Sequence, residues 1–228
     1  MRYVYIAIAL MMVAGCAMAD DIVTMPTANQ LKAGQVDVAG YYLKLDSPAG
    51  NPQHAYYQTV YVGLTDRIEL DAHRTDVDND KIATVLVGSF KLLSETPTVP
   101  DLVVGCRNLL GTATTNNPAF KGKSEDRSYF VSAAKTFFVN PLQPGPPLVR
   151  AHLSLGTADW TLLGEKRHEG LFGGLQFRFR PEIGAVLEND GQDTITGLTI
   201  MPKNTGLTLK GGTFGDHWWA GLAFRKSF

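Results

Sequence analysis

The chain consists largely of segments of about ten residues in which apolar and polar side chains alternate, separated by residues that favour turns. Alternation with a period of two is typical of β-strands that have one apolar and one polar face. The 23 glycines and 12 prolines are spread along the 228 residues, which agrees with many turns between short elements. We therefore predict an all-β fold of twelve strands, at residues 35–45, 55–64, 67–75, 82–93, 102–110, 127–139, 148–157, 171–180, 182–188, 194–201, 207–212 and 217–228.

The alternation has a clear polarity, but it does not say which face points outward. In the strand predicted at 148–157, Val149, Leu153 and Leu155 share one face, and Arg150 and His152 share the other. A soluble sandwich or barrel buries the apolar face, whereas a transmembrane barrel turns it toward lipid.

Three features favour the membrane. Most predicted strands have the roughly 9–11 residues that a transmembrane strand needs. The longest predicted connections, among them 111–126 and 158–170, fall on one side, as in outer-membrane barrels with short periplasmic turns. The last strand ends on Phe228, with Leu222 and Phe224 in phase, and resembles the signal read by the outer-membrane assembly machinery, although Lys226 departs from it. We predict a closed, antiparallel, up-and-down transmembrane β-barrel in the bacterial outer membrane, in contact with its lipid and lipopolysaccharide.

The first residues have the features of a secretory signal peptide. Arg2 precedes an apolar run, and Ala17 and Ala19 form a small-x-small cleavage site before Asp20. Within the same stretch, residues 13–16 (VAGC) resemble the lipobox of bacterial lipoproteins, which makes Cys16 a candidate for lipidation. The two cleavages exclude each other, and both remain open. The predicted organisation is a signal peptide at 1–19, a lead at 20–34 and one barrel domain at 35–228.

The polar faces of the predicted strands carry charges of both signs, which we expect to line the lumen. They either pair and plug the barrel, because an unpaired charge in a dry interior is costly, or form a narrow polar passage. We favour the plugged form. The candidate lumen residues are Glu69, Asp71, Arg150, His152, Arg178, Arg180, Glu182, Glu188 and Lys210.

Other chemistry has little support in the sequence. The net charge of -1 provides no basic stripe for nucleic acid. The five histidines stand apart from Cys or His partners at zinc spacing, so we expect no metal site and no cofactor. His152 and Ser154 share a strand face, but a hydrolase would also need a group that orients the histidine. We therefore assign no catalytic residues.

Several stretches resemble the YjbH-like outer-membrane β-barrel family in order and spacing. They are MPTA at 25–28, YVGLTDRIEL at 61–70, VVGCRNLLGT at 103–112, YFVSAAK at 129–135, FGG at 172–174 and ENDG at 188–191. The resemblance implies an association with exopolysaccharide production and export, and thus a polysaccharide or an export-complex component as a partner. Family members are typically longer than this chain.

The leading hypothesis is therefore a non-enzymatic outer-membrane barrel with a structural or narrow-channel role. Two alternatives remain open from the sequence. One is a membrane-embedded hydrolase that uses His152 and Ser154, and the other is a soluble periplasmic β-barrel that binds a ligand inside.

Overall fold

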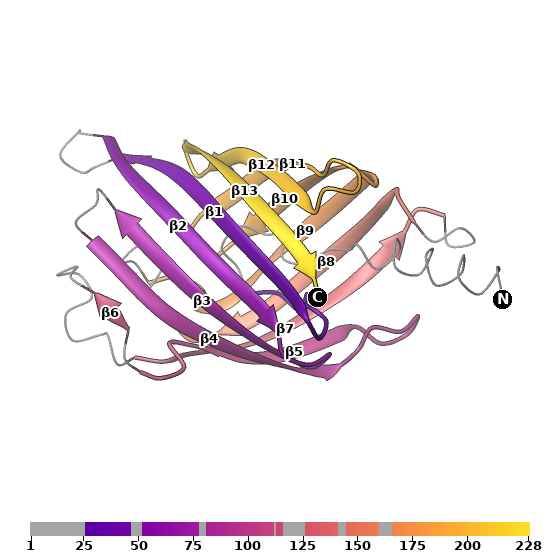
Figure 1. Cartoon of the computed structure of the whole chain (residues 1–228), viewed down its shortest axis with the longest axis horizontal. Helices are drawn as coiled ribbons and strands as arrows, with labels where there is room; N and C mark the ends of the chain where they lie inside the picture. The colour runs from indigo at the N-terminus through magenta and orange to yellow at the C-terminus, as the bar shows by residue number, and fades with distance from the viewer. Residues whose placement is uncertain are drawn as a thin grey trace.

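The structure is a computed structural model that describes residues 26–46, 52–77, 81–111, 113–115, 126–140, 145–159 and 166–228 (Figure 1). The predicted signal peptide at 1–19 and the lipidation candidate Cys16 lie outside the described residues. Of the predicted lead, residues 26–34 are described.

Thirteen strands occur in the described residues, and twelve of them form the closed wall of an antiparallel barrel. They are β1 (Gln35–Asp46), β2 (Pro52–Gly63), β3 (Ile68–Val77), β4 (Lys81–Leu93), β5 (Asp101–Arg107), β6 (Thr114–Thr115), β7 (Ser128–Phe138), β8 (Leu148–Gly156), β9 (Gly170–Arg180), β10 (Ile183–Asn189), β11 (Thr194–Ile200), β12 (Leu207–Phe214) and β13 (His217–Ser227). Successive wall strands pair with each other, and β1 pairs with β13 from Gln35↔Ser227 to Leu43↔Trp219 to close the ring. The predicted fold class is confirmed.

The strand boundaries differ from the prediction mainly around β5. The strand expected at 102–110 ends at Arg107, because Asn108 adopts a left-handed backbone with φ of 53° and turns the chain. Within the connection predicted at 111–126, the two-residue strand β6 pairs with β4 through Thr114↔Thr84 and Thr115↔Ala83. Residues 112 and 116–125 of that connection lie outside the described part.

Burial alternates along the strands with the polar side chains inside. In β3, Glu69, Asp71 and His73 are buried, whereas Ile68 and Leu70 are exposed. The same holds for β8, where Leu153 is 56% exposed and His152 4%. A water-soluble protein would not leave such a continuous apolar surface exposed to solvent. The apolar face therefore meets lipid, and the soluble-barrel alternative, which requires the opposite orientation, does not fit.

Aromatic side chains mark the two edges of this apolar surface. At one edge, Tyr42 contacts both Tyr56 and Trp218, with ring centroids 5.4 and 5.0 Å away. At the other edge, aromatic side chains are exposed on four strands: Phe90, Phe137, Phe179 and Phe224. Paired aromatic girdles of this kind lie at the two membrane interfaces of outer-membrane barrels.

The connections orient the barrel. The two longest, between β5 and β7 and between β8 and β9, leave from the same rim as β6, which lies at the left of Figure 1. Because outer-membrane barrels have their longer loops outside the cell, this is the external rim, and the C-terminus lies at the periplasmic rim. No helix among the described residues is long and apolar enough to cross a membrane.

Large aromatic side chains fill one half of the interior. Tyr41 of β1 packs between Tyr57 and Trp219, with ring centroids 6.0 and 6.1 Å away. The indole nitrogen of Trp219 donates to the carbonyl of Thr196 at 3.0 Å. Because Gly221 faces Tyr41 across the β1–β13 pair, the ring can lie against the wall. The other half of the interior contains most of the polar groups.

Candidate functional site

The N-terminal segment, residues 26–34, runs into the barrel, with residues 26–31 inside and residues 32–34 exposed. Ala28 and Leu31 are 0% and 2% exposed, and Thr27 and Asn29 are also buried. The carbonyl oxygen of Pro26 accepts hydrogen bonds from the hydroxyls of Ser132 and Ser154, both at 3.2 Å. The two serine hydroxyls lie 2.8 Å apart. The segment therefore reaches the polar inner faces of β7 and β8.

Further contacts tie the same segment to three other strands. The amide of Leu31 donates to Oε2 of Glu69 on β3 at 2.6 Å. Nε2 of Gln30 donates to the hydroxyl of Ser89 on β4 at 2.6 Å. Nδ2 of Asn29 lies 3.4 Å from Oε1 of Gln176 on β9. Polar groups from five strands thus hold one short peptide inside the lumen.

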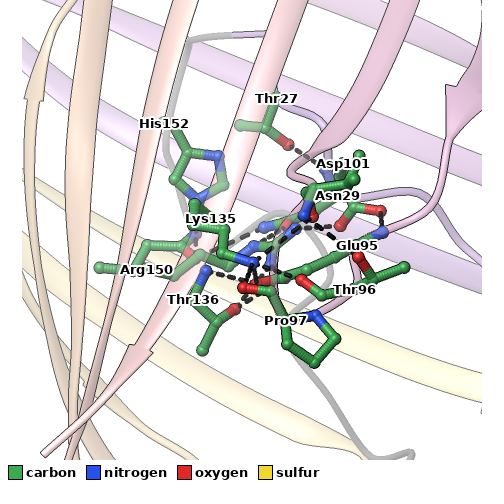
Figure 2. A network of polar contacts seen from close by, with 12 residues as sticks. Thr27, Asn29, Glu95, Thr96, Pro97, Asp101, Lys135, Thr136, Arg150 and His152 are labelled. Carbon is green, nitrogen blue, oxygen red and sulfur yellow. Dashed lines mark hydrogen bonds and ion pairs between the residues drawn. The ribbon is translucent and has the colours of Figure 1, made fainter.

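Arg150 joins this segment to the wall near the periplasmic rim (Figure 2). Its Nε donates to Oδ1 of Asn29 at 2.7 Å. Its Nη1 pairs with Glu95 and its Nη2 with Asp101, each at 2.5 Å. Nη1 also donates to the hydroxyl of Thr136 at 2.7 Å. One guanidinium therefore holds two carboxylates and the N-terminal segment together, because its nitrogens lie in one plane and donate in different directions.

Glu95 comes from the connection between β4 and β5, which folds over the periplasmic rim. Its Oε1 accepts a hydrogen bond from the amide of Thr136 at 2.7 Å. From the outer side of β7, the ammonium of Lys135 donates to the carbonyls of Pro97 and Val99 at 3.1 and 3.4 Å. The connection is thus fixed to β7 and β8 through the carboxylate of Glu95 and through its own backbone carbonyls (Figure 2).

A second ionic cluster occupies the external half of the interior. Arg107 pairs with Asp159 at 2.5 Å, and both side chains are at most 3% exposed. Arg167 pairs with Asp190 at 2.5 Å and Asp193 at 2.9 Å. A backbone bridge between Asp159 and Arg167 joins the two pairs.

Residues of the β8–β9 connection therefore fold into the external mouth. Burial opposes the charge on Arg167, but its pairing with Asp190 and Asp193 outweighs burial and raises the pKa of the guanidinium. The guanidinium also lies over the ring of Phe214, 5.0 Å from its centroid. The guanidinium of Arg167 therefore stays charged across the physiological pH range.

Most of the predicted lumen residues are buried. Glu69, Asp71, Arg150, His152, Arg178, Glu188 and Lys210 are each at most 9% exposed. Lys210 donates to the hydroxyl of Tyr41 at 3.2 Å, and Arg178 to the carbonyl of Pro181 at 3.3 Å.

Two predicted lumen residues lie elsewhere. Arg180 is exposed because it is the last residue of β9, where the wall ends. Glu182 occupies the turn after β9 and pairs with Lys203 of the next periplasmic turn at 2.9 Å. That contact lowers the pKa of Glu182.

Several residues of both clusters escaped the sequence analysis. Asp101 and Arg107 lie in phase on the inner face of β5, and strict attention to alternation would have found them. Asn29, Glu95 and Asp159 come from segments without periodicity. Nothing in their sequence indicates that they fold into the barrel.

His152 and Ser154 make contacts other than those a hydrolase requires. Nε2 of His152 lies 3.1 Å from the amide oxygen of Gln176, and the hydroxyl of Ser154 bonds Ser132 and Pro26. Both side chains are buried under the N-terminal segment. Within the described ranges, no group of three or more His, Cys, Asp or Glu residues is placed to hold a metal ion.

The closed wall, the apolar outer surface between two aromatic girdles and the polar interior define a transmembrane β-barrel of the bacterial outer membrane. No protein-family model matches the chain. No curated protein matches it either.

Solved structures of outer-membrane barrels are similar in fold. The KdgM porin, alone and "in complex with disordered oligogalacturonate", aligns with a TM-score of 0.49 at 10% identity, over 84% of this chain and 99% of that one. The COG4313 outer membrane channel from Pseudomonas putida F1 aligns with a TM-score of 0.45 at 11% identity, over 91% of this chain and 100% of that one.

Proposed function

We propose that the protein is a non-enzymatic outer-membrane barrel that its own N-terminal segment keeps closed. The observation that carries this proposal is the path of residues 26–31, whose polar groups bond side chains of β3, β4, β7, β8 and β9 inside the lumen. The two ionic clusters near the rims support it, because paired buried charges stabilise a filled interior instead of offering free sites to a solute.

The segment is held in a way that is compatible with release. In each of these six hydrogen bonds the wall contributes a side chain and not a backbone group, and residues 26–34 are not part of any strand. A narrow passage that opens when the segment leaves is therefore the second candidate function. The polar groups then exposed would include Ser132, Ser154, Gln176 and Arg150, which offer both donors and acceptors to a hydrated solute.

Conductance across a planar bilayer separates the two functions. We expect the parent protein to be silent, and a variant that lacks residues 20–31 but retains 1–19 to give small, reproducible steps. A gel shift between unheated and boiled samples would show that both proteins are folded. Equal steps from both would contradict closure by the segment. A folded deletion variant that stays silent would show that side chains alone fill the lumen.

A link to exopolysaccharide production follows from the resemblance to YjbH-like proteins and belongs to the same proposal. The external connection between β5 and β7 is the surface we propose for contact with glycan or an export component, since long loops on a rigid scaffold often carry binding. Deleting residues 116–125 should leave assembly intact and reduce surface polysaccharide. Unchanged polysaccharide in a correctly assembled deletion strain would contradict this contact.

A further inference from the structure

One arginine lies on the lipid-facing surface instead of the lumen. Arg74 follows His73 in β3 and precedes Thr75, and both of these neighbours are buried. The side chain of Arg74 is exposed in the same register as the lipid-facing Ile68 and Leu70. Within the described part of the chain it makes no hydrogen bond and no ion pair. The side chains of the wall that the structure describes therefore give this guanidinium no partner.

The residues beside Arg74 are polar as well. Across the two neighbouring strands it is paired with Gln58 on β2 and Thr84 on β4, and both side chains are exposed. Strands β2, β3 and β4 lie side by side in the purple part of the barrel in Figure 1. An amide, a guanidinium and a hydroxyl thus form one row on a surface that is otherwise largely apolar.

The register places this row at the external membrane interface. The next row toward the external rim contains Asp76, paired with Tyr56, which is in turn paired with Tyr42 of the external aromatic girdle. Arg74 is three residues from Val77, the external end of β3. A lipid-facing charge is costly near the membrane centre and tolerated near the interfaces, where it meets headgroups. The group at this depth in the outer leaflet that complements a guanidinium is a phosphate.

We propose that Arg74, flanked by Gln58 and Thr84, binds a phosphate group of lipopolysaccharide in the outer leaflet. Arginine suits this role, because its planar donors bind phosphate oxygens in pairs and stay charged at every relevant pH. Gln58 and Thr84 can donate to the remaining oxygens. The site is independent of the lumen, since it lies on the other face of the wall.

Two charged neighbours bear on this site. Lys44 of β1 is on the same outer surface, in the row of His54, and has no ion-pair partner among the described residues. Asp76 is two residues from Arg74 on the same face, and its Oδ1 has no hydrogen-bond partner in the described structure. A carboxylate there repels phosphate. Direct binding by Arg74 therefore predicts that Asp76→Asn strengthens the interaction.

The test uses the full-length protein in non-ionic detergent, titrated with purified lipopolysaccharide. Arg74→Ala should weaken binding about fivefold, as expected for loss of one basic residue at an anionic membrane surface. Arg67→Ala is the matched control, because Arg67 is an exposed arginine in the turn before β3, at the periplasmic rim. The Arg67→Ala variant should bind lipopolysaccharide with the affinity of the parent. The gel shift on boiling would verify that each variant is folded.

Chemical variation of the lipid completes the test. Dephosphorylated lipopolysaccharide should bind the parent and Arg74→Ala with equal affinity. Inorganic phosphate alone should not compete with lipopolysaccharide for the site. The proposal would be overturned if Arg74→Ala bound lipopolysaccharide with the affinity of the parent. It would also be overturned if the parent bound the dephosphorylated and the phosphorylated lipid with the same affinity. Binding that needs Mg²⁺ and is lost in Asp76→Asn would also overturn it, because the carboxylate would then bind the lipid through a cation. None of these outcomes depends on whether the lumen is closed.

Discussion

The guanidinium of Arg150 on β8 donates from Nε to the side-chain oxygen of Asn29 at 2.7 Å, across 121 residues of sequence. Its other nitrogens hold Glu95 and Asp101. This one side chain thus connects the N-terminal segment, the β4–β5 connection and the start of β5 near the periplasmic rim (Figure 2).

Removing Arg150 should destabilise the barrel substantially. Arg150→Ala removes the nearer cation from two carboxylates, which keep only the longer contacts of Glu95 with Lys135 at 3.6 Å and of Asp101 with Lys91 at 3.8 Å. We expect the free energy of unfolding to fall by about 3 kcal/mol, at the lower end for a broken buried pair because of these contacts and because Glu95 is 22% exposed. Urea unfolding in lipid vesicles measures this loss. Arg180→Ala, which removes an exposed arginine on the next strand, should change it by no more than about 0.5 kcal/mol. Similar losses in both variants would contradict the role given to Arg150.

Charge on the outer surface should be tolerated according to depth. Leu153 is 56% exposed near the middle of β8, and Leu153→Arg should cost about 2–4 kcal/mol and impair assembly. Val139, 67% exposed just beyond the periplasmic end of β7, is the comparison, and Val139→Arg should cost at most about 1 kcal/mol. Folded yield in vesicles gives the answer. If both substitutions were equally tolerated, the assignment of the lipid face would be wrong.

Alanine substitutions at two glycines on the paired strands β1 and β13 should have different effects on stability. A Cβ atom on Gly221 would lie 2.3 Å from Cδ1 of Tyr41, whose ring is already confined by Tyr57 and Trp219. Gly221→Ala should therefore lower the free energy of unfolding by about 1–3 kcal/mol. Gly40 faces lipid on the paired strand with no atom within 4 Å of such a Cβ, so Gly40→Ala should be neutral or slightly stabilising. Unfolding midpoints in urea compare the two.

The pair formed by Glu182 and Lys203 should contribute to stability in a pH-dependent way. The hydrogen bond between the side chains of Glu182 and Lys203 holds the pKa of Glu182 below the ordinary value of 4.5. The contribution is therefore present above that value and disappears as the pH falls through the lowered pKa. Comparing the parent with Glu182→Gln from neutral to acid pH should show a small difference that vanishes in acid. A difference that grows toward low pH would contradict the pairing.

The wall of the barrel was predictable from the sequence, because each strand has a local signature. The alternation in residues such as Arg150, His152 and Leu153 indicates both the strand and its two faces, and strand length indicates the membrane. The same reasoning placed Arg180 and Glu182 in the lumen, since a periodic pattern does not show where the wall stops. In the structure these two residues lie at the periplasmic rim, Arg180 just before the β9–β10 turn and Glu182 within it.

The sequence by itself determined the twelve-stranded wall and the apolar face of each strand, because period-two alternation is a property of neighbouring residues. Only the tertiary structure decided what fills the lumen. Asn29, Glu95 and Asp159 lie in segments without periodicity, and their partners Arg150 and Arg107 come from distant strands. The identity of such partners depends on which inner faces the closed ring brings together, and on the requirement that charges confined there must be paired.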